Sequence, residues 1–295
     1  MRIGLIQQAN VADFDDNMSR LVESISECAG LGAEVVVMQE LHNTLYFCQT
    51  EDPGLFDAAE SIPGTSTMTF GLLAKHYKIV IVLSLFEKCA PGVYYNTAVV
   101  LDRDGTIAGR YRKMHIPDDP GYYEKFYFTP GDLGFAPIAT SIGKLGVMVC
   151  WDQWFPEAAR LMALRGADIL IYPTAIGSDR SEGKEERARQ YDAWVTIQRS
   201  HAIANGLPVV SVNRTGFEAS PAGGGEGIHF WGGSFVAGPQ GEVLGKIKGD
   251  VSDVLVTDIP DRVEAVRRIW PFFRDRRTDA YDGLAKRYIE GNGDR

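Results

Sequence analysis

The order of secondary-structure signals is the same in the two halves of this sequence. The first half contains, in chain order, an apolar run at 3–7, a helical stripe at 17–31, AEVVVMQE, a helix from about 66 to 78, IVIVLSLFE and TAVVLDRDGTIAGRYRK. The second half contains LGVMVC, PEAARLMALRG, GADILIYPT, a helix from about 188 to 205, LPVVSVN and GGSFVAGPQGEVLGKIKG. Runs of β-branched residues such as AEVVVMQE are typical of strands that are buried on both faces. The repeat therefore predicts two related sheets.

Two sheets that each carry helices on one face bury their other faces most economically against each other. We therefore expect a single α/β domain built as a four-layer α-β-β-α sandwich, with two mixed sheets and an internal pseudo-twofold repeat. A single doubly wound sheet is the alternative that the same alternation of strands and helices allows.

The charge and composition of the chain limit its partners. Of 295 residues, 45% are hydrophobic and the net charge is −9, so the chain lacks the basic surface that nucleic acid or an anionic membrane requires. No apolar run approaches the roughly 18 residues of a membrane helix, and the opening MRIGLIQQ is too short an apolar run for a signal peptide. Four cysteines without CxxC or zinc spacing indicate free thiols in a reducing compartment, so we expect the cytoplasm.

Three polar residues follow apolar runs, at the strand ends where α/β proteins build their sites. Glu40 ends VVVMQE, Lys113 ends TIAGRYRK and Cys150 ends GVMVC. Singly, each has an ordinary structural explanation, and a lone cysteine is more often core than catalytic. Together they fit acyl transfer: the carboxylate is a general base for the thiol, and the ammonium lowers the thiol pKa and holds a developing oxyanion. The backbone N–H of Trp151 would be a second oxyanion donor.

Two other kinds of site are weaker alternatives. His42 and His115 lie near Glu40 and Lys113 in sequence, which leaves a Cys–His hydrolase open. The five histidines show no HxxxH or HxH pairing, so we expect no metal site. The run GGGEG at 223–227 lacks the GK[ST] ending of a phosphate loop and does not follow a strand, so we expect a flexible surface turn.

Three segments make the sequence resemble the nitrilase, or carbon–nitrogen hydrolase, superfamily from RIGLIQ to about residue 275. They are VVVMQEL around Glu40, GRYRKMHIP around Lys113 and GVMVCWDQWFPEAARL around Cys150. The resemblance implies a Glu–Lys–Cys triad in a four-layer sandwich. Many members carry a second glutamate between the lysine and the cysteine, and its match is Glu124 in GYYEKFYFTPGD; a surface carboxylate in an aromatic loop is the structural alternative.

The resemblance also implies an organisation for the whole chain. We expect a carbon–nitrogen hydrolase domain over residues 1–275 and a C-terminal tail over 276–295, with the tail at a subunit interface of a homodimer or larger homo-oligomer. Neither a metal ion nor an organic cofactor is implied.

Within the superfamily, PDDPGYYEKFYFTPGDLGF and CWDQWFPEAARL resemble the subgroup that hydrolyses N-carbamoylputrescine to putrescine, carbon dioxide and ammonia. The implied reaction begins with attack of Cys150 on the ureido carbonyl, assisted by Glu40. Lys113 and the Trp151 amide would stabilise the tetrahedral intermediate, and Glu124 would position substrate or aid proton transfer.

The distal ammonium of such a substrate requires an acidic or aromatic partner in a partly desolvated pocket. The aromatic segment 114–137 has no regular periodicity, which is typical of a functional loop. The candidate substrate-binding residues are Asp118, Asp119, Asp179, Glu182, Tyr46 and Trp151. Solvated loop charge or core packing is the alternative for each of them.

Two rival functions remain open at this stage. An N-carbamoyl-amino-acid or β-ureidopropionate amidohydrolase of the same superfamily would need a cationic clamp for its substrate carboxylate, and Arg180, Arg187 and Arg189 are available for it. A catalytically silent binding protein on the same fold would tolerate loss of the triad, and the intact triad disfavours it.

Overall fold

The computed structural model describes residues 1–179, 181–221 and 227–289, and the strands of its first half form one mixed sheet. The strands are β1 (Arg2–Gln7), β2 (Val35–Val37), β3 (Val80–Ala90), β4 (Val93–Leu101), β5 (Ile107–Arg112) and β15 (Asp253–Asp258), in the order β15-β1-β2-β3-β4-β5. β1, β2 and β3 are parallel, whereas β15, β4 and β5 pair antiparallel with their neighbours.

The second half forms a sheet with the same plan. Its strands are β6 (Ile138–Thr140), β7 (Gly143–Val147), β8 (Ile169–Thr174), β10 (Val209–Asn213), β13 (Phe235–Ala237) and β14 (Val243–Lys246), in the order β14-β13-β10-β8-β7-β6. β7, β8 and β10 are parallel, and the outer three pair antiparallel. Because both the order and the directions of the strands recur, the predicted pair of mixed sheets and the internal repeat are confirmed.

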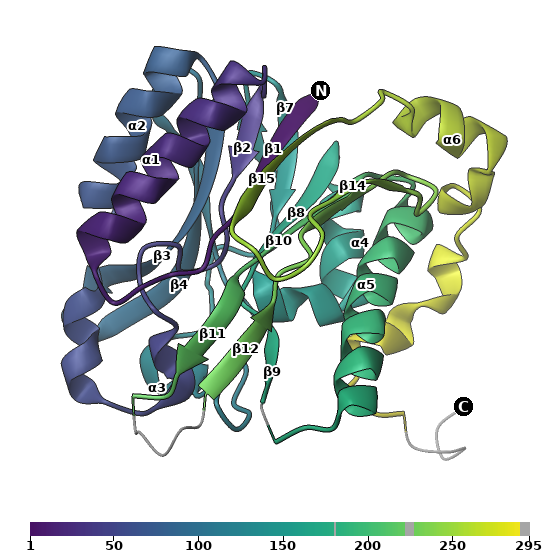
Figure 1. The fold of residues 1–295 in the computed structure, drawn as a ribbon. Coiled ribbons are helices and arrows are strands. Elements are labelled where there is room, and N and C mark those ends of the chain that lie inside the picture. Colours follow the sequence, from purple (N-terminus) through teal and green to yellow (C-terminus); the bar gives the residue numbers. More distant parts are fainter. Residues whose placement is uncertain (180, 222–226, 290–295) are drawn as a thin grey trace.

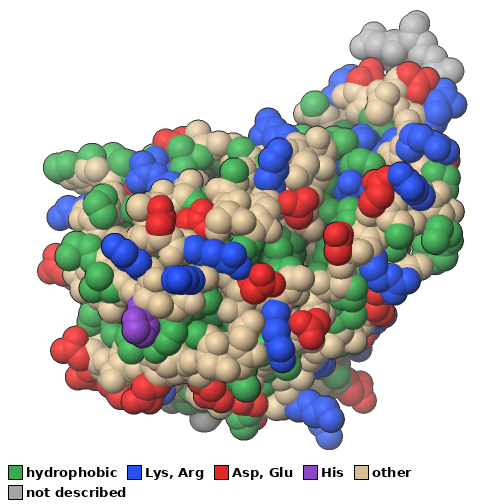
Figure 2. Space-filling model, turned by 90° about the horizontal axis from the view of Figure 1, so that it is seen from above, with side chains coloured by type: hydrophobic (Ala, Val, Ile, Leu, Met, Phe, Trp, Pro, Cys, Tyr) green, Lys and Arg blue, Asp and Glu red, His purple; other side chains and the backbone are tan. Residues whose placement is uncertain are grey.

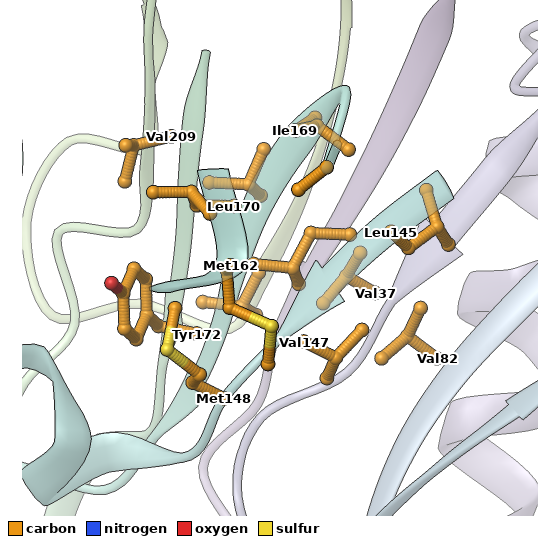
Figure 3. Packing of buried hydrophobic residues seen from close by; sticks show 14 of the residues in the cluster. Val37, Val82, Leu145, Val147, Met148, Met162, Ile169, Leu170, Tyr172 and Val209 are labelled. Carbon is orange, nitrogen blue, oxygen red and sulfur yellow. The ribbon is translucent and has the colours of Figure 1, made fainter. Parts of the chain in front are cut away.

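Helices cover the outer faces of the two sheets, which pack against each other inside (Figure 1). α1 (Phe14–Gly30) and α2 (Thr65–Tyr77) cover the first sheet, and α4 (Pro156–Leu164) and α5 (Lys184–Asn205) cover the second. Alternate residues of a strand point to opposite faces. Accordingly, Ile81 packs with the helix-side core, whereas Val82 packs with the core between the sheets. Figure 3 shows Val37 and Val82 lying beside Val147. The four-layer sandwich is therefore confirmed, and the single doubly wound sheet is wrong.

The two long helices begin earlier than their apolar stripes predict. α1 starts at Phe14 because the Asp13 side chain caps it by accepting from the Asp16 N–H at 2.8 Å. α5 starts at Lys184, four residues before the predicted start. Its first turn is polar and therefore gives no periodic signal, but Glu185 and Glu186 favour a helix N-terminus.

The structure contains short elements in both halves that were not predicted. A small third sheet joins β9 (Gly177–Asp179), β11 (Thr215–Ala219) and β12 (Gly227–Trp231) in the order β11-β12-β9. Residues 223–226 of the run expected as a surface turn lie outside the described residues, whereas Gly227 begins β12. The aromatic segment 114–137 contains one helical turn, α3 (Glu124–Tyr127). Short 3-10 helices η1 (Phe47–Gln49) and η2 (Pro53–Ala58) precede α2.

The chain after β15 lies on the outside of the second half (Figure 1). It contains α6 (Val263–Ile269) and the 3-10 helices η4 (Pro271–Phe273), η5 (Thr278–Ala280) and η6 (Asp282–Ala285). The Arg160 guanidinium of α4 lies 5.2 Å from the ring centre of Phe273, so residues up to η4 pack on their own domain. In the predicted tail, Leu284 and Tyr288 are exposed, and residues 290–295 lie outside the described part.

None of the described helices is long and apolar enough to cross a membrane. On the face drawn in Figure 2, acidic and basic side chains are interspersed rather than gathered into one basic patch.

Candidate active site

Three charged side chains from distant parts of the chain meet between the two halves. The Nζ atom of Lys113 lies 2.8 Å from Oε1 of Glu40 and 2.6 Å from Oε2 of Glu124. All three side chains are almost completely buried. Glu124 is therefore an interior carboxylate, and the surface alternative for it is wrong. The ammonium donates a charge-assisted hydrogen bond to each carboxylate, which is the arrangement that makes a buried cation tolerable.

The strand ends bring these residues together. Glu40 lies three residues beyond β2, and its N–H donates to the carbonyl of Thr174, the last residue of β8 in the opposite sheet, at 3.4 Å. Lys113 directly follows β5. Cys150 lies three residues beyond β7, and its Sγ donates to the carbonyl of Ala175, directly after β8, at 3.8 Å. The carboxyl ends of strands from both sheets therefore meet at one place.

Cys150 is not the last residue of a strand, as the sequence predicted, but the first residue of the 3-10 helix η3 (Cys150–Trp154). Its φ of 41° is one of three positive values among the non-glycine residues of the described chain. For a side chain other than glycine, this left-handed conformation costs on the order of 1–3 kcal/mol and is kept only where the surroundings impose it. The sharp turn separates the sulfur from the strand, and Cys150 lines a cavity.

Burial and charge set the protonation of the sulfur. Burial raises the pKa of Cys150 well above its ordinary value, and Glu40 raises it further, whereas Lys113 lowers it. The expected effect of the lysine is present but is outweighed. The resting group is therefore a neutral thiol, which requires a base before it can attack.

The pKa values of Lys113 and Glu124 determine which of the two can exchange a proton near neutral pH. Burial opposes the charge of Lys113, but Glu124 and Glu40 raise its pKa well above the ordinary value, so it remains an ammonium. Burial raises the pKa of Glu124 to about 7, because the lowering by Lys113 only partly compensates and Glu40 raises it further. Near neutral pH, Glu124 is therefore a proton donor and acceptor beside a permanent cation.

Further buried polar groups fix the backbone and side chain of Glu40. The Nδ2 group of Asn96 donates to Oε1 of Glu40 at 2.7 Å, which leaves Oε2 buried and without a hydrogen-bond partner in the described structure. Arg214 donates to the backbone carbonyls of Glu40 at 3.1 Å, Leu41 at 2.7 Å and Thr44 at 2.8 Å. The free oxygen is the one that is available to take a proton.

A cavity of about 760 Å³ opens beside these residues. Cys150, Glu124 and Trp151 lie in its wall. The charged residues of its described lining are Asp119, Glu124, Asp179 and Glu182, and no Lys, Arg or His is among them. A cavity with only acidic charges in its described wall favours a cationic ligand.

The other predicted substrate-binding residues differ in their positions. Asp118 is exposed and lies 3.9 Å from Nζ of Lys125. Tyr46 is fully buried, donates its hydroxyl to Oε1 of Glu124 at 2.7 Å and is not among the described lining residues, so it holds that carboxylate in place. Glu182 accepts from Gln190 Nε2 at 2.6 Å through Oε1, whereas its Oε2 is buried and without a partner in the described part of the chain.

The two histidines of the Cys–His alternative make other contacts. Nδ1 of His42 lies 2.6 Å from the carbonyl oxygen of Ser84, and Nδ1 of His115 lies 2.7 Å from Oδ1 of Asp152. Within the described residues, neither ring hydrogen-bonds to Cys150, whose Sγ donates to the carbonyl of Ala175. Among the described residues, no group of three or more His, Cys, Asp or Glu side chains is arranged to hold a metal ion.

Three residues of the site were missed by the sequence reasoning. Asn96 and Arg214 carried a signal, because each is a polar residue inside or directly after an apolar strand. The hydroxyl of Tyr122 makes two hydrogen bonds with the backbone of Gly177: it donates to the carbonyl at 3.2 Å and accepts from the N–H at 3.1 Å. Only the aromatic character of its loop pointed to it, because the contact joins residues 55 positions apart.

Comparisons with known proteins agree with this geometry. Residues 2–268 match the family model "Carbon-nitrogen hydrolase". The chain is 44% identical to an N-carbamoylputrescine amidase of Oryza sativa subsp. japonica, over 96% of this chain and 93% of that protein. It is 38% identical to a citrullinase of Francisella tularensis, over 98% and 99% of the two chains. A crystal structure of a carbon–nitrogen hydrolase from Helicobacter pylori G27 matches it with a TM-score of 0.95 and 52% identity, covering 98% of this chain and 99% of that one. This chain therefore belongs to the carbon–nitrogen hydrolase family and is an amidohydrolase that acts on amide C–N bonds.

Proposed function

We propose that this enzyme hydrolyses N-carbamoylputrescine to putrescine, carbon dioxide and ammonia. The observation that carries the proposal is the cavity beside Cys150, whose described lining holds four carboxylates, Asp119, Glu124, Asp179 and Glu182, and no cationic side chain. A linear substrate with a neutral ureido end and a distal ammonium complements such a wall. The similarity to the rice N-carbamoylputrescine amidase supports the same substrate.

The first half of the reaction uses the buried triad. Glu40 takes the thiol proton, and Sγ of Cys150 attacks the ureido carbonyl. Lys113 and the backbone N–H of Trp151 stabilise the negative oxygen of the tetrahedral intermediate. The C–N bond to the terminal NH₂ then breaks, and the proton held by Glu40 leaves with it as ammonia. A thioester between Cys150 and the N-alkylcarbamoyl group remains.

The second half restores the enzyme. Water gives a proton to Glu40 and its oxygen adds to the thioester carbonyl; the C–S bond then breaks and Cys150 recovers the proton. The released alkylcarbamic acid decomposes to carbon dioxide and putrescine. Glu124, with a pKa raised to about 7 mainly by burial, keeps Lys113 in place and exchanges protons with the substrate nitrogen.

The distal end of the substrate is assigned to Glu182. Its Oε2 is buried and without a partner in the described structure, and the residue lies in the cavity wall together with Asp179. An unpaired buried carboxylate oxygen is costly unless a donor reaches it. The substrate ammonium is such a donor, and Trp151 and Asp119 form further parts of the wall.

Substrates that carry a carboxylate are the alternative to N-carbamoylputrescine, and the charge of the cavity wall distinguishes the two classes. An N-carbamoyl amino acid or β-ureidopropionate would bring its negative charge towards these acids, and so would the carboxylate of citrulline. Of the arginines considered as a clamp, Arg189 is exposed and paired with Glu186, Arg187 is not among the lining residues, and Arg180 lies outside the described residues.

The experiment compares kcat/KM of the purified protein for N-carbamoylputrescine, citrulline and N-carbamoyl-β-alanine, with ammonia release as the readout. We expect a preference for N-carbamoylputrescine of at least about 100-fold, since a mismatched charge in a partly buried site costs several kcal/mol. Mass spectrometry of quenched reactions should find the N-alkylcarbamoyl adduct on Cys150. Equal or better turnover of either carboxylate substrate would refute the assignment.

The proposal extends to the assembly and its compartment. The exposed apolar residues of the segment from 276, Leu284, Tyr288 and Ile289, support an interface in a homodimer or larger homo-oligomer, next to a hydrolase domain ending near residue 275. Light scattering of the full chain and of a chain ending at 275 tests the interface. The particles of the shorter chain should contain fewer subunits and therefore have a smaller mass.

Four free cysteines support a reducing compartment, the cytoplasm.

A further inference from the structure

Asp152 is fully buried beside the candidate site, and its carboxylate accepts four hydrogen bonds. Oδ1 accepts from the backbone N–H of His115 at 3.1 Å and from Nδ1 of the same residue at 2.7 Å. Oδ2 accepts from Oη of Tyr111 at 2.8 Å and from the backbone N–H of Val149 at 3.0 Å. A carboxylate offers about four lone-pair sites, so this one is fully used.

The donors belong to the two segments that carry the proposed triad. Three of the four bonds come from the residues two positions before and two positions after Lys113. The fourth comes from the residue directly before Cys150. One carboxylate thus ties the end of β5 and the following loop to the turn that holds the sulfur.

The donor groups are themselves held in place. Burial raises the pKa of Tyr111 well above its ordinary value, and Asp152 raises it further, so the hydroxyl stays protonated and donates. The His115 ring stacks on Phe155 with 3.7 Å between ring centres and 6° between ring planes. These contacts fix the direction from which each donor meets the carboxylate.

The same carboxylate closes the turn with the unusual backbone. Its bond to the Val149 N–H spans Cys150, whose φ of 41° non-glycine residues rarely adopt. Such a conformation persists only where the surrounding structure over-determines it. Asp152 is the polar group that both holds this turn and reaches across to the lysine segment.

We propose that Asp152 is a positioning residue, which sets the distance between the Lys113 ammonium and the Cys150 sulfur without touching the substrate. The assignment rests on the proposed roles of those two residues. Asp152 is not among the residues that line the cavity, so its replacement should change kcat rather than KM.

The principal test is Asp152→Asn, which keeps the shape but replaces one acceptor oxygen by an NH₂ donor. We expect kcat for N-carbamoylputrescine to fall by about 10- to 100-fold, the scale that a misplacement of about 1 Å produces, with KM within about threefold of the wild type. The matched control is Asp102→Asn, because Asp102 accepts the N–H and hydroxyl of Ser141 at the far end of β4 from Asn96. That variant should keep kcat.

A second readout does not depend on the substrate. The rate of Cys150 alkylation by iodoacetamide is followed by mass spectrometry as a function of pH. Because Lys113 lowers the thiol pKa, a lysine displaced by Asp152→Asn should move the alkylation profile to higher pH. Asp102→Asn should leave it unchanged. If the wild-type protein does not turn over N-carbamoylputrescine, the proposed substrate is wrong, while this profile still decides the role of Asp152.

Tyr111→Phe is the milder variant, which tests the inference even if Asp152→Asn does not fold. It removes one of the four bonds and should lower kcat severalfold, in the same direction and again without a matching change in KM. An unchanged kcat and an unchanged alkylation profile in folded Asp152→Asn, or in Tyr111→Phe if the former is unfolded, would overturn the proposal.

Discussion

Lys113 lies closer to Glu124 than to Glu40, with 2.6 Å from Nζ to Oε2 of the former and 2.8 Å to Oε1 of the latter. One buried cation therefore serves two buried carboxylates, and the cluster carries a negative charge in excess when both acids are ionised. The interior relieves this excess by protonating one acid. Burial, opposed by Lys113 and aided by Glu40, raises the pKa of Glu124 to about 7.

This pKa predicts a pH-dependent stability that Glu124→Gln should remove. The folded-state pKa of about 7 lies above the ordinary glutamate value of 4.5, so between these values the native state binds more protons than the unfolded state. The contribution of Glu124 is fully present below about pH 4.5 and is lost as the pH rises through about 7, with a slope of at most about 1.4 kcal/mol per pH unit. Urea denaturation from pH 5 to 8 measures it. Parallel pH curves for the two proteins would contradict the prediction.

A second prediction concerns the sulfur. Cys150→Ala and Cys150→Ser should both abolish detectable ammonia release, because the first has no nucleophile and the second has a hydroxyl whose pKa is far higher than that of a thiol. Circular dichroism and the urea midpoint should show folded proteins. The control is Cys28→Ala, which alters a buried thiol on α1 outside the site and should keep full activity per folded molecule. An active Cys150→Ala variant would end the mechanism.

A third prediction separates substrate binding from chemistry. Glu182→Gln removes the charge of the carboxylate whose Oε2 is buried and unpaired in the described structure. A hydrogen bond to a charged group contributes about 1.5–3 kcal/mol, so KM for N-carbamoylputrescine should rise about 10- to 100-fold with little change in kcat. Asp118→Asn is the control, since that exposed acid pairs with Lys125 outside the cavity wall. Equal effects of the two variants would remove Glu182 from the binding site.

Most of the fold could be predicted from the sequence, because apolar runs report burial directly. The recurring order of strands and helices predicted both sheets. Alternate residues of these strands, such as Ile81 and Val82, face different layers. Short or polar elements gave no such signal. β2 covers only Val35–Val37 of a longer apolar run, and the third sheet is built from strands that mix glycine and polar residues.

The site was predicted unevenly for the same physical reason. Glu40, Lys113 and Cys150 follow apolar strands and could be identified as a set. What surrounds them depends on contacts between distant segments, such as the hydroxyl of Tyr46, which meets a carboxylate 78 positions away. The sequence predicted Tyr46 in the substrate pocket, whereas the structure places it outside the described cavity lining, hydrogen-bonded to Glu124. Net pKa shifts could not be predicted either, because burial decides them.

The last prediction concerns Arg214, which is fully buried and joins the small sheet to the loop of Glu40. It donates to three backbone carbonyls and, at 2.7 Å, to Oε1 of Glu218. Arg214→Met would leave the Glu40 carbonyl without a donor and Glu218 as an uncompensated interior charge, whereas the Thr44 carbonyl still accepts from Asn10 Nδ2 and the Leu41 carbonyl from the Thr44 N–H. Removing one partner of a buried ion pair costs about 3–5 kcal/mol, so the free energy of unfolding in urea should fall by that amount.

Two comparisons make this prediction specific. Arg268→Met breaks an exposed pair with Glu264 and should change the free energy of unfolding by less than about 1 kcal/mol. Adding Glu218→Gln to Arg214→Met should restore part of the loss, because the second substitution removes the charge that the first one strands. If Arg214→Met costs no more than Arg268→Met, then Arg214 does not stabilise the loop that carries Glu40. The same loss in the double variant as in the single one would show that the cost arises from the backbone carbonyls rather than from the ion pair.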